Sequence, residues 1–206
     1  MEETLATPNR LNALSDGVFA VIITVLALDL RPPHGATLCA LMCLWPVAIS
    51  YAVSYLFIAI VWINHHHVLR FAKTATPRLI WGNFAHLFTV SLIPFSTSWI
   101  AETKLGAIPV AAYAVVFILV NTTYILLCRE GVDLSKARSV TPKQRKMMRM
   151  RAVATIVVFA AAAATALASP ICGMGLICAC LLLYLKPEAP DLSFDIRLTS
   201  SSTDAI

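Results

Sequence analysis

Long apolar stretches separated by short polar segments make up most of this sequence. A helix that crosses a lipid bilayer needs about 20 mainly apolar residues. Six stretches meet or approach that length, and we expect each of them to form a membrane-spanning helix. Their expected bounds are residues 10–30, 38–63, 79–100, 106–128, 152–169 and 170–185. The last two stretches are short and adjoin at Ser169-Pro170, which predicts a tight turn between two helices.

The composition agrees with this pattern. Apolar residues make up 59% of the 206 residues, charged residues make up 13%, and the mean hydropathy is +0.78. A soluble domain has about 45–50% apolar and about 25% charged residues. An ordinary cytosolic enzyme, a disordered protein and a disulfide-stabilised secreted domain are therefore excluded. We expect an all-α polytopic membrane protein, with one six-helix domain over residues 1–190 and a disordered tail over 191–206.

The positive charges are distributed unevenly between the expected loops. Six spans place both termini on one side, and only Arg31 and Lys104 then fall in the opposite loops, which leaves 14 of the 16 lysines and arginines on the side of the termini. The positive-inside rule therefore predicts a cell-membrane protein with cytoplasmic N- and C-termini. The basic run 143–151 is interpreted as a topology determinant beside anionic lipid, so no nucleic-acid partner is expected. The first stretch has an acidic start and favours a retained helix over a signal peptide.

Polar side chains gather at the expected cytoplasmic ends of the first three spans. Polar groups at membrane depth are costly unless they are paired. Because these ends lie at a similar depth, we expect a network that includes Asp16 as an acceptor. Its expected members are Arg10, Ser15, Asp16, Trp62, His65, His66 and His86. The alternative is that each residue is hydrated separately, with Asp16 as a helix cap and Trp62 as an interfacial anchor.

Three consecutive histidines, His65, His66 and His67, suggest a metal site at first sight. Successive residues of a helix point about 100° apart, so three in a row do not converge on one ion. We therefore expect no metal site and no cofactor, and at most two of these rings in the network.

A stripe along the first span carries no charge. Gly17, Val21, Thr24 and Leu28 recur at steps of four, three and four residues, and Val25 flanks them. The pattern is typical of ordinary helix packing in membranes. It also fits the wall of a pore with an apolar constriction, and the sequence contains no TVGYG filter.

The start of the first span contains a recognisable motif. Arg10-x-x-x-Leu14-Ser15-Asp16 resembles the signature R-x-x-x-F-S-D of the transmembrane protein 175 family, the endosomal and lysosomal potassium channels. Here Leu14 replaces the phenylalanine of the family. Residues 62–66 (WINHH) and 92–95 (LIPF) are also similar to that family, and the similarity covers roughly the first 130 residues. The chain resembles the short prokaryotic form, with one six-helix unit per subunit.

This resemblance implies a homotetramer in the lipid bilayer, with a central pore lined by the first span and potassium as the permeant ion. It also implies conduction through apolar rings and one threonine layer. By offset from the motif, the narrowest ring falls on Val21 and the threonine layer on Thr24. Val25 and Leu28 are then expected to form further apolar layers.

Two other function classes remain open from the residues alone. A proton-coupled or small-solute transporter could use Asp16 and His86 as a relay. A membrane enzyme could use the histidine cluster, although no convincing acid–base pair or metal set is present and we expect no catalytic residues.

Overall fold

Helices make up the regular secondary structure of the described part of the chain. The structure, a computed structural model, describes residues 7–72, 74–133 and 142–184. The expected tail at 191–206 and the expected domain end at 185–190 lie outside these residues. The helices are α1 (Pro8–Leu28), α2 (Leu38–Met42), α3 (Trp45–Phe71), α4 (Pro77–Glu102), α5 (Ala107–Cys128), the π-helical turn η1 (Arg129–Asp133), α6 (Pro142–Ala168) and α7 (Pro170–Tyr184).

Several helices begin where the local sequence favours a start. Proline occupies the first turn of α1, α3 and α4, where its missing N–H costs no helical hydrogen bond. Thr76 precedes α4, and its hydroxyl oxygen accepts a hydrogen bond from the backbone N–H of Leu79 at 3.2 Å. Thr37 caps α2 in the same way through the N–H of Ala40. Such caps satisfy the free N–H groups of a first turn.

The expected bounds of the second span, 38–63, are wrong at both ends. Residues 38–42 form the separate short helix α2, and the long helix α3 starts only at Trp45, directly before Pro46. Pro46 has no backbone N–H to bond to the carbonyl of Met42, so α2 does not continue through it, whereas in the first turn of α3 that N–H is not needed. At its other end α3 runs through the three histidines to Phe71, because its polar side chains find partners within the bundle.

The fifth span differs from expectation at its start, whereas the sixth begins at Pro170 as expected. Helix α6 begins at Pro142, ten residues before the expected start at 152, so the basic run is itself helical. Among the described residues, five helices are long and apolar enough to cross a membrane: α1, α3, α4, α5 with η1, and α6. Helix α7 has 15 residues, about 22 Å at 1.5 Å per residue, which is shorter than the hydrocarbon core of about 30 Å. The chain is thus an all-helical, multi-pass membrane protein.

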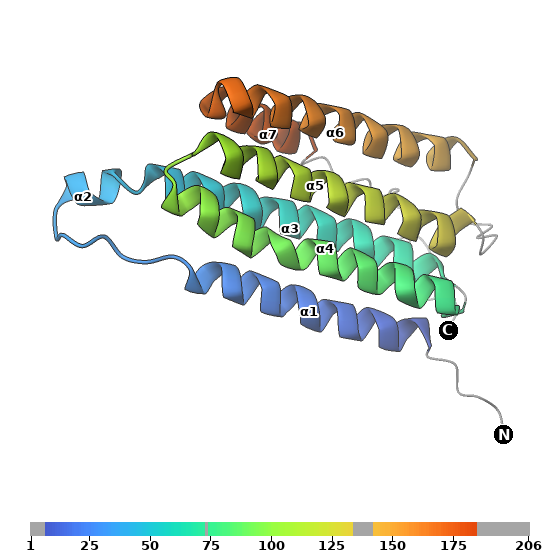
Figure 1. The fold of residues 1–206 in the computed structure, drawn as a ribbon. Coiled ribbons are helices and arrows are strands. Elements are labelled where there is room, and N and C mark those ends of the chain that lie inside the picture. The colour runs from blue at the N-terminus through green and yellow to red at the C-terminus, as the bar shows by residue number, and fades with distance from the viewer. Residues whose placement is uncertain (1–6, 73, 134–141, 185–206) are drawn as a thin grey trace, which may run out of the picture.

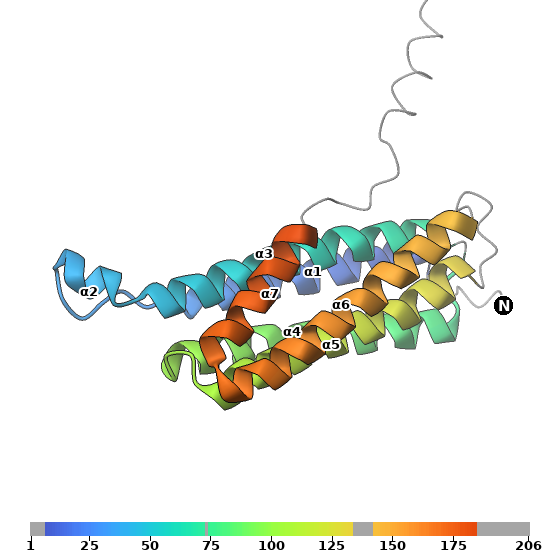
Figure 2. The same cartoon turned by 90° about the horizontal axis from the view of Figure 1, so that it is seen from above.

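The long helices lie side by side, with α1 at one edge of the bundle (Figure 1). Helix α1 packs against α3 and α4, whereas α6 and α7 cover α5 on the other side, as the turned view also shows (Figure 2). The rings of Phe57, Phe117 and Phe159 meet in the core, where Phe57 stacks on Phe117 at a centroid distance of 3.7 Å. These rings belong to a core that also includes buried residues of α1, α4 and α7, such as Phe19, Ile93 and Ile177. One long side of α1 lies outside this core.

Candidate pore helix and its polar anchor

The two faces of α1 differ sharply in burial. Every third or fourth residue packs into the bundle, and these buried side chains are Leu11, Ser15, Phe19, Ile22 and Leu26. The opposite face carries the four residues that the sequence singles out as a pore wall, and we call Val21, Thr24, Val25 and Leu28 the exposed stripe. Val21 is 60% exposed and Leu28 is 80% exposed within the single chain. The described residues of its own chain therefore leave the exposed stripe largely uncovered.

The stripe offers one hydroxyl group in an otherwise apolar surface. Thr24 donates its hydroxyl hydrogen to the backbone carbonyl of Val21 at 2.7 Å, and Ala20 O lies at 3.1 Å. Because the hydrogen is directed to the backbone, the lone pairs of the Thr24 oxygen remain available on the exposed side. Gly17, one turn before Val21, is also exposed, and a Cβ added there would meet no atom within 4 Å.

A chain of buried hydrogen bonds joins α1 to α3 and α4. Ser15 is fully buried, donates to the carbonyl of Leu11 at 2.8 Å and accepts from Nδ2 of Asn83 at 3.0 Å. The amide oxygen of Asn83 accepts from Nε2 of His65 at 2.6 Å. Since an amide oxygen can only accept, His65 carries its proton on Nε2. One asparagine on α4 thus links α1 to α3.

Two further hydrogen bonds connect α1 to α3 nearer the surface. Trp62 donates from Nε1 to a carboxylate oxygen of Asp16 at 2.8 Å. Asn12 donates from Nδ2 to Nδ1 of His66 at 3.0 Å. We call the seven residues in these hydrogen bonds the polar anchor. It consists of Asn12, Ser15, Asp16, Trp62, His65, His66 and Asn83.

Arg10 and His86 of the expected network lie outside the polar anchor. Arg10 is exposed, and the structure gives its side chain no hydrogen bond or ion pair with the described residues, although its backbone N–H bonds to the carbonyl of Thr7. His86 is buried and bonds through Nδ1 to the hydroxyl of Thr123 on α5 at 3.0 Å. Its ring stacks on His65 with centroids 5.6 Å apart and planes 6° apart. His86 therefore connects α4 to α5 through its hydrogen bond and packs its ring against His65, and it makes no hydrogen bond to Asp16.

The expected members of the network did not include Asn12 or Asn83, although Asn83 lies in the polar segment at the start of the third span. Asn12 stands four residues before Asp16, and Asn83 stands three residues before His86, so each shares a helix face with a residue that was singled out. This helical spacing is the feature of the sequence that could have predicted both residues as members of the network.

The histidine run spreads its rings to different partners. His65 faces Asn83, His66 faces Asn12, and His67 is half-buried on another side of α3. Within residues 7–72, 74–133 and 142–184, no group of three or more His, Cys, Asp or Glu side chains is placed to hold a metal ion. The arrangement therefore serves helix packing and hydrogen bonding.

Comparison with known proteins identifies the family. The chain is 30% identical over 183 residues to a potassium channel from Chryseobacterium sp. (strain P1-3), and this alignment covers 88% of the chain and 94% of that protein. The family described as the endosomal/lysosomal potassium channel TMEM175 matches residues 10–94. The chain belongs to the TMEM175 family. The resemblance carried by the first-span motif is thereby confirmed.

Other TMEM175 relatives agree with this assignment. The chain is 35% identical over 117 residues to a potassium channel from Streptomyces collinus, over 53% of the chain and 57% of that protein. The crystal structure of a lysosomal potassium-selective channel TMEM175 homolog from Chamaesiphon minutus superimposes with a TM-score of 0.75 at 22% identity, over 89% of this chain and 98% of that one. At that identity the likeness establishes the TMEM175 fold.

The matched region contains the whole candidate site. Residues 10–94 include all of the exposed stripe and all seven residues of the polar anchor. Helix α5, which packs nearby, lies outside the matched region. TMEM175 is a channel family and not an enzyme family, which removes the membrane-enzyme alternative.

Proposed function

We propose that this TMEM175 chain conducts potassium ions across the cell membrane as a homotetramer, through a central pore lined by α1. The observation that carries the proposal is the exposed stripe, which the described residues of its own chain leave largely uncovered while the opposite face of α1 is packed. One helix face cannot enclose a path by itself, so several copies must surround an axis. The potassium channels among the curated relatives favour potassium as the permeant ion.

Four copies of the stripe would form stacked rings along the axis. Val21 is proposed as the narrowest ring, Val25 and Leu28 as further apolar layers, and Thr24 as the hydroxyl layer. An apolar ring opposes ion passage because an ion loses water there without gaining new ligands. The oxygen of Thr24, with its hydrogen turned to the backbone, supplies the ligand nearest to that ring.

The polar anchor is proposed to hold α1 in position around the axis. It joins α1 to both neighbouring helices at one depth, through the bonds of Ser15, Asp16 and Asn12. Buried polar groups are stable in lipid only when they are paired. Rotation of α1 would break these pairs together, so the pairs fix which face of α1 points to the axis. This role differs from the relay of a transporter, because Asp16 bonds to Trp62 and His86 bonds to Thr123.

The proposed topology has cytoplasmic termini and α7 as a sixth, tilted span. The start of α1, the end of α3, the start of α4, the end of α5 and the start of α6 share one end of the bundle (Figure 1). Helix ends at this level carry Arg70, Arg78, Arg129, Arg145 and Arg149. The concentration of positive charge at one end supports its placement on the cytoplasmic side.

Recordings from purified protein in planar bilayers test the function. Under a potassium gradient the current of the wild type should reverse near the potassium equilibrium potential. Val21→Asn should raise the conductance and lower the preference for potassium over sodium, because an amide holds water where the apolar ring excludes it. The measurements are single-channel conductance and reversal potential in paired potassium and sodium solutions.

Val157→Asn on α6 is the matched control. Val157 is 62% exposed against 60% for Val21, and the substitution makes the same chemical change on a helix at the opposite edge of the bundle from α1 (Figure 1). We expect Val157→Asn to conduct like the wild type. A changed conductance in Val157→Asn together with an unchanged one in Val21→Asn would show that α1 does not line the path.

A further inference from the structure

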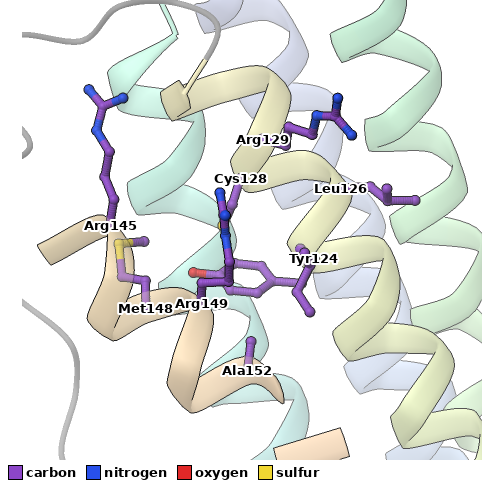
Figure 3. A pocket seen from close by; sticks show the side chains of 9 residues that line it. Tyr124, Leu126, Cys128, Arg129, Arg145, Met148, Arg149 and Ala152 are labelled. Atoms are coloured by element: carbon purple, nitrogen blue, oxygen red, sulfur yellow. The ribbon is translucent and has the colours of Figure 1, made fainter. Parts of the chain in front are cut away.

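A basic pocket lies between the end of α5 and the start of α6, away from the exposed stripe. Its volume is about 270 Å³. The described residues that line it are Tyr124, Ile125, Leu126, Cys128 and Arg129 from α5 and η1, and Arg145, Met148, Arg149 and Ala152 from α6. Figure 3 shows Arg149 extending from α6 toward the end of α5, beside Tyr124.

Three arginines and no described acidic residue line this pocket. Arg145 and Arg149 stand four residues apart, so both project from the same face of α6. The third, Arg129, comes from η1. Each guanidinium has five N–H donors in a planar fork that matches the oxygen atoms of a phosphate. Arg145 and Arg149 also interact within the chain, and five donors allow a phosphate to be added to those contacts.

Most of the remaining lining is apolar, and part of it lies deeper in the membrane than the arginines. Ala152 is one turn beyond Met148 into the membrane-spanning part of α6, and Tyr124 is one turn before Cys128 on α5, so both lie deeper than the arginines. Leu126 is 51% exposed at the side of the pocket. The pocket is therefore charged where the two spans reach the membrane surface and apolar toward the hydrocarbon, which is the polarity of a phospholipid.

We propose that this pocket binds the phosphate headgroup of an anionic phospholipid, with the first part of an acyl chain against Leu126 and Met148. Arg145 and Arg149 bind the phosphate oxygens, and the hydroxyl of Tyr124 adds a polar contact below them. The apolar walls favour a lipid over free phosphate, because free phosphate would leave them exposed to water. A zwitterionic lipid is disfavoured because its ammonium group would lie among three arginines.

Native mass spectrometry of the purified protein with added lipid tests this proposal. We expect phosphatidylglycerol to bind at one copy per subunit and phosphatidylcholine to be lost under the same conditions. Arg149→Gln should weaken phosphatidylglycerol binding on the order of 10-fold, since it removes a charge-assisted hydrogen bond. Arg145→Gln should act in the same direction, and Arg149→Lys, which keeps the charge, should retain more binding than Arg149→Gln.

Lys146→Gln is the matched control, because Lys146 is exposed on the same turn of α6 and does not line the pocket. It makes the same change in net charge, and binding should stay at the wild-type level. Equal losses in Lys146→Gln and Arg149→Gln would overturn the proposal in favour of diffuse attraction to charge. Displacement of phosphatidylglycerol by an equal concentration of inorganic phosphate would overturn the choice of a lipid. If one arginine variant does not fold, as judged by circular dichroism, the other decides.

Discussion

Asn83 joins three helices through one side-chain amide. Its nitrogen donates to Ser15 on α1, its oxygen accepts from His65 on α3, and the residue itself belongs to α4. All three side chains are fully buried. A buried donor or acceptor that loses its partner costs about 1–3 kcal/mol. The position of α1 therefore depends on a residue that does not belong to α1.

Asn83→Ala should destabilise the protein and reduce potassium current, because it leaves the N–H of His65 without an acceptor and Ser15 without a donor. We expect the melting temperature in detergent to fall on the order of 5 °C. Ser91→Ala, also on α4, is the control, since Ser91 is exposed and bonds only to the backbone of Phe88. Equal melting temperatures for the two variants would mean that the polar anchor does not stabilise the fold.

At the scale of elements, α6 and α7 meet through small side chains. A Cβ added at Gly173 of α7 would lie 2.7 Å from Cβ and 2.8 Å from Cα of Ala166, and 3.0 Å from the carbonyl of Ala162. Close approach of helix backbones through small residues is a common mode of packing in membranes. Van der Waals contact between the two helices thus requires glycine at this one position of α7.

Gly173→Ala should lower the melting temperature, because overpacking of a tight contact costs about 1–3 kcal/mol and exceeds the gain in helix propensity of about 1 kcal/mol. Gly175→Ala provides the comparison, since a Cβ at Gly175 would meet no atom within 4 Å. It should leave the melting temperature unchanged or raise it. Thermal unfolding of both variants in one detergent measures the difference, and a fall in Gly175→Ala alone would contradict the described packing of α7.

At the scale of the whole molecule, one side of α1 is left exposed by the described residues of its own chain. The exposed stripe ends at Leu28, at the opposite end of α1 from the polar anchor. If α1 surrounds a symmetry axis, equivalent Leu28 residues of different subunits lie close to one another. Helix α6 lies at the opposite edge of the bundle from α1 (Figure 1), and Leu167, near the matching end of α6, is also exposed.

Leu28→Cys should therefore form crosslinked dimers with a short bismaleimide, in a background in which the exposed cysteines Cys39, Cys43 and Cys172 are replaced by serine. Leu167→Cys in the same background should stay monomeric, because α6 is expected on the periphery. Denaturing gels measure the crosslinked fraction, and light scattering in mild detergent should give the mass of four 22.4 kDa chains. Crosslinking of Leu167→Cys alone would place α6 rather than α1 at the axis.

The sequence by itself determined the class of the protein and the positions of most spans. Apolar length decides which segments enter a membrane, and this property is local, so α1, α4 and α5 begin and end within two residues of expectation. The motif around Ser15 and Asp16 likewise pointed to the TMEM175 family. The break before α3 depends on Pro46. The early start of α6 lies in a basic run, which a hydropathy pattern does not predict to be part of a membrane-spanning helix.

Only the tertiary structure decided which polar groups pair. Asn83 rather than Arg10 bonds to the buried end of α1, and His86 bonds to Thr123 rather than to Asp16. Such pairs depend on the rotation of each helix about its axis and on the axial register between neighbours. Hydropathy fixes neither quantity, because it records only how many residues lie in lipid. These contacts determine which face of α1 is exposed, because the packed residues around Phe19 leave Val21 and Leu28 outside the core.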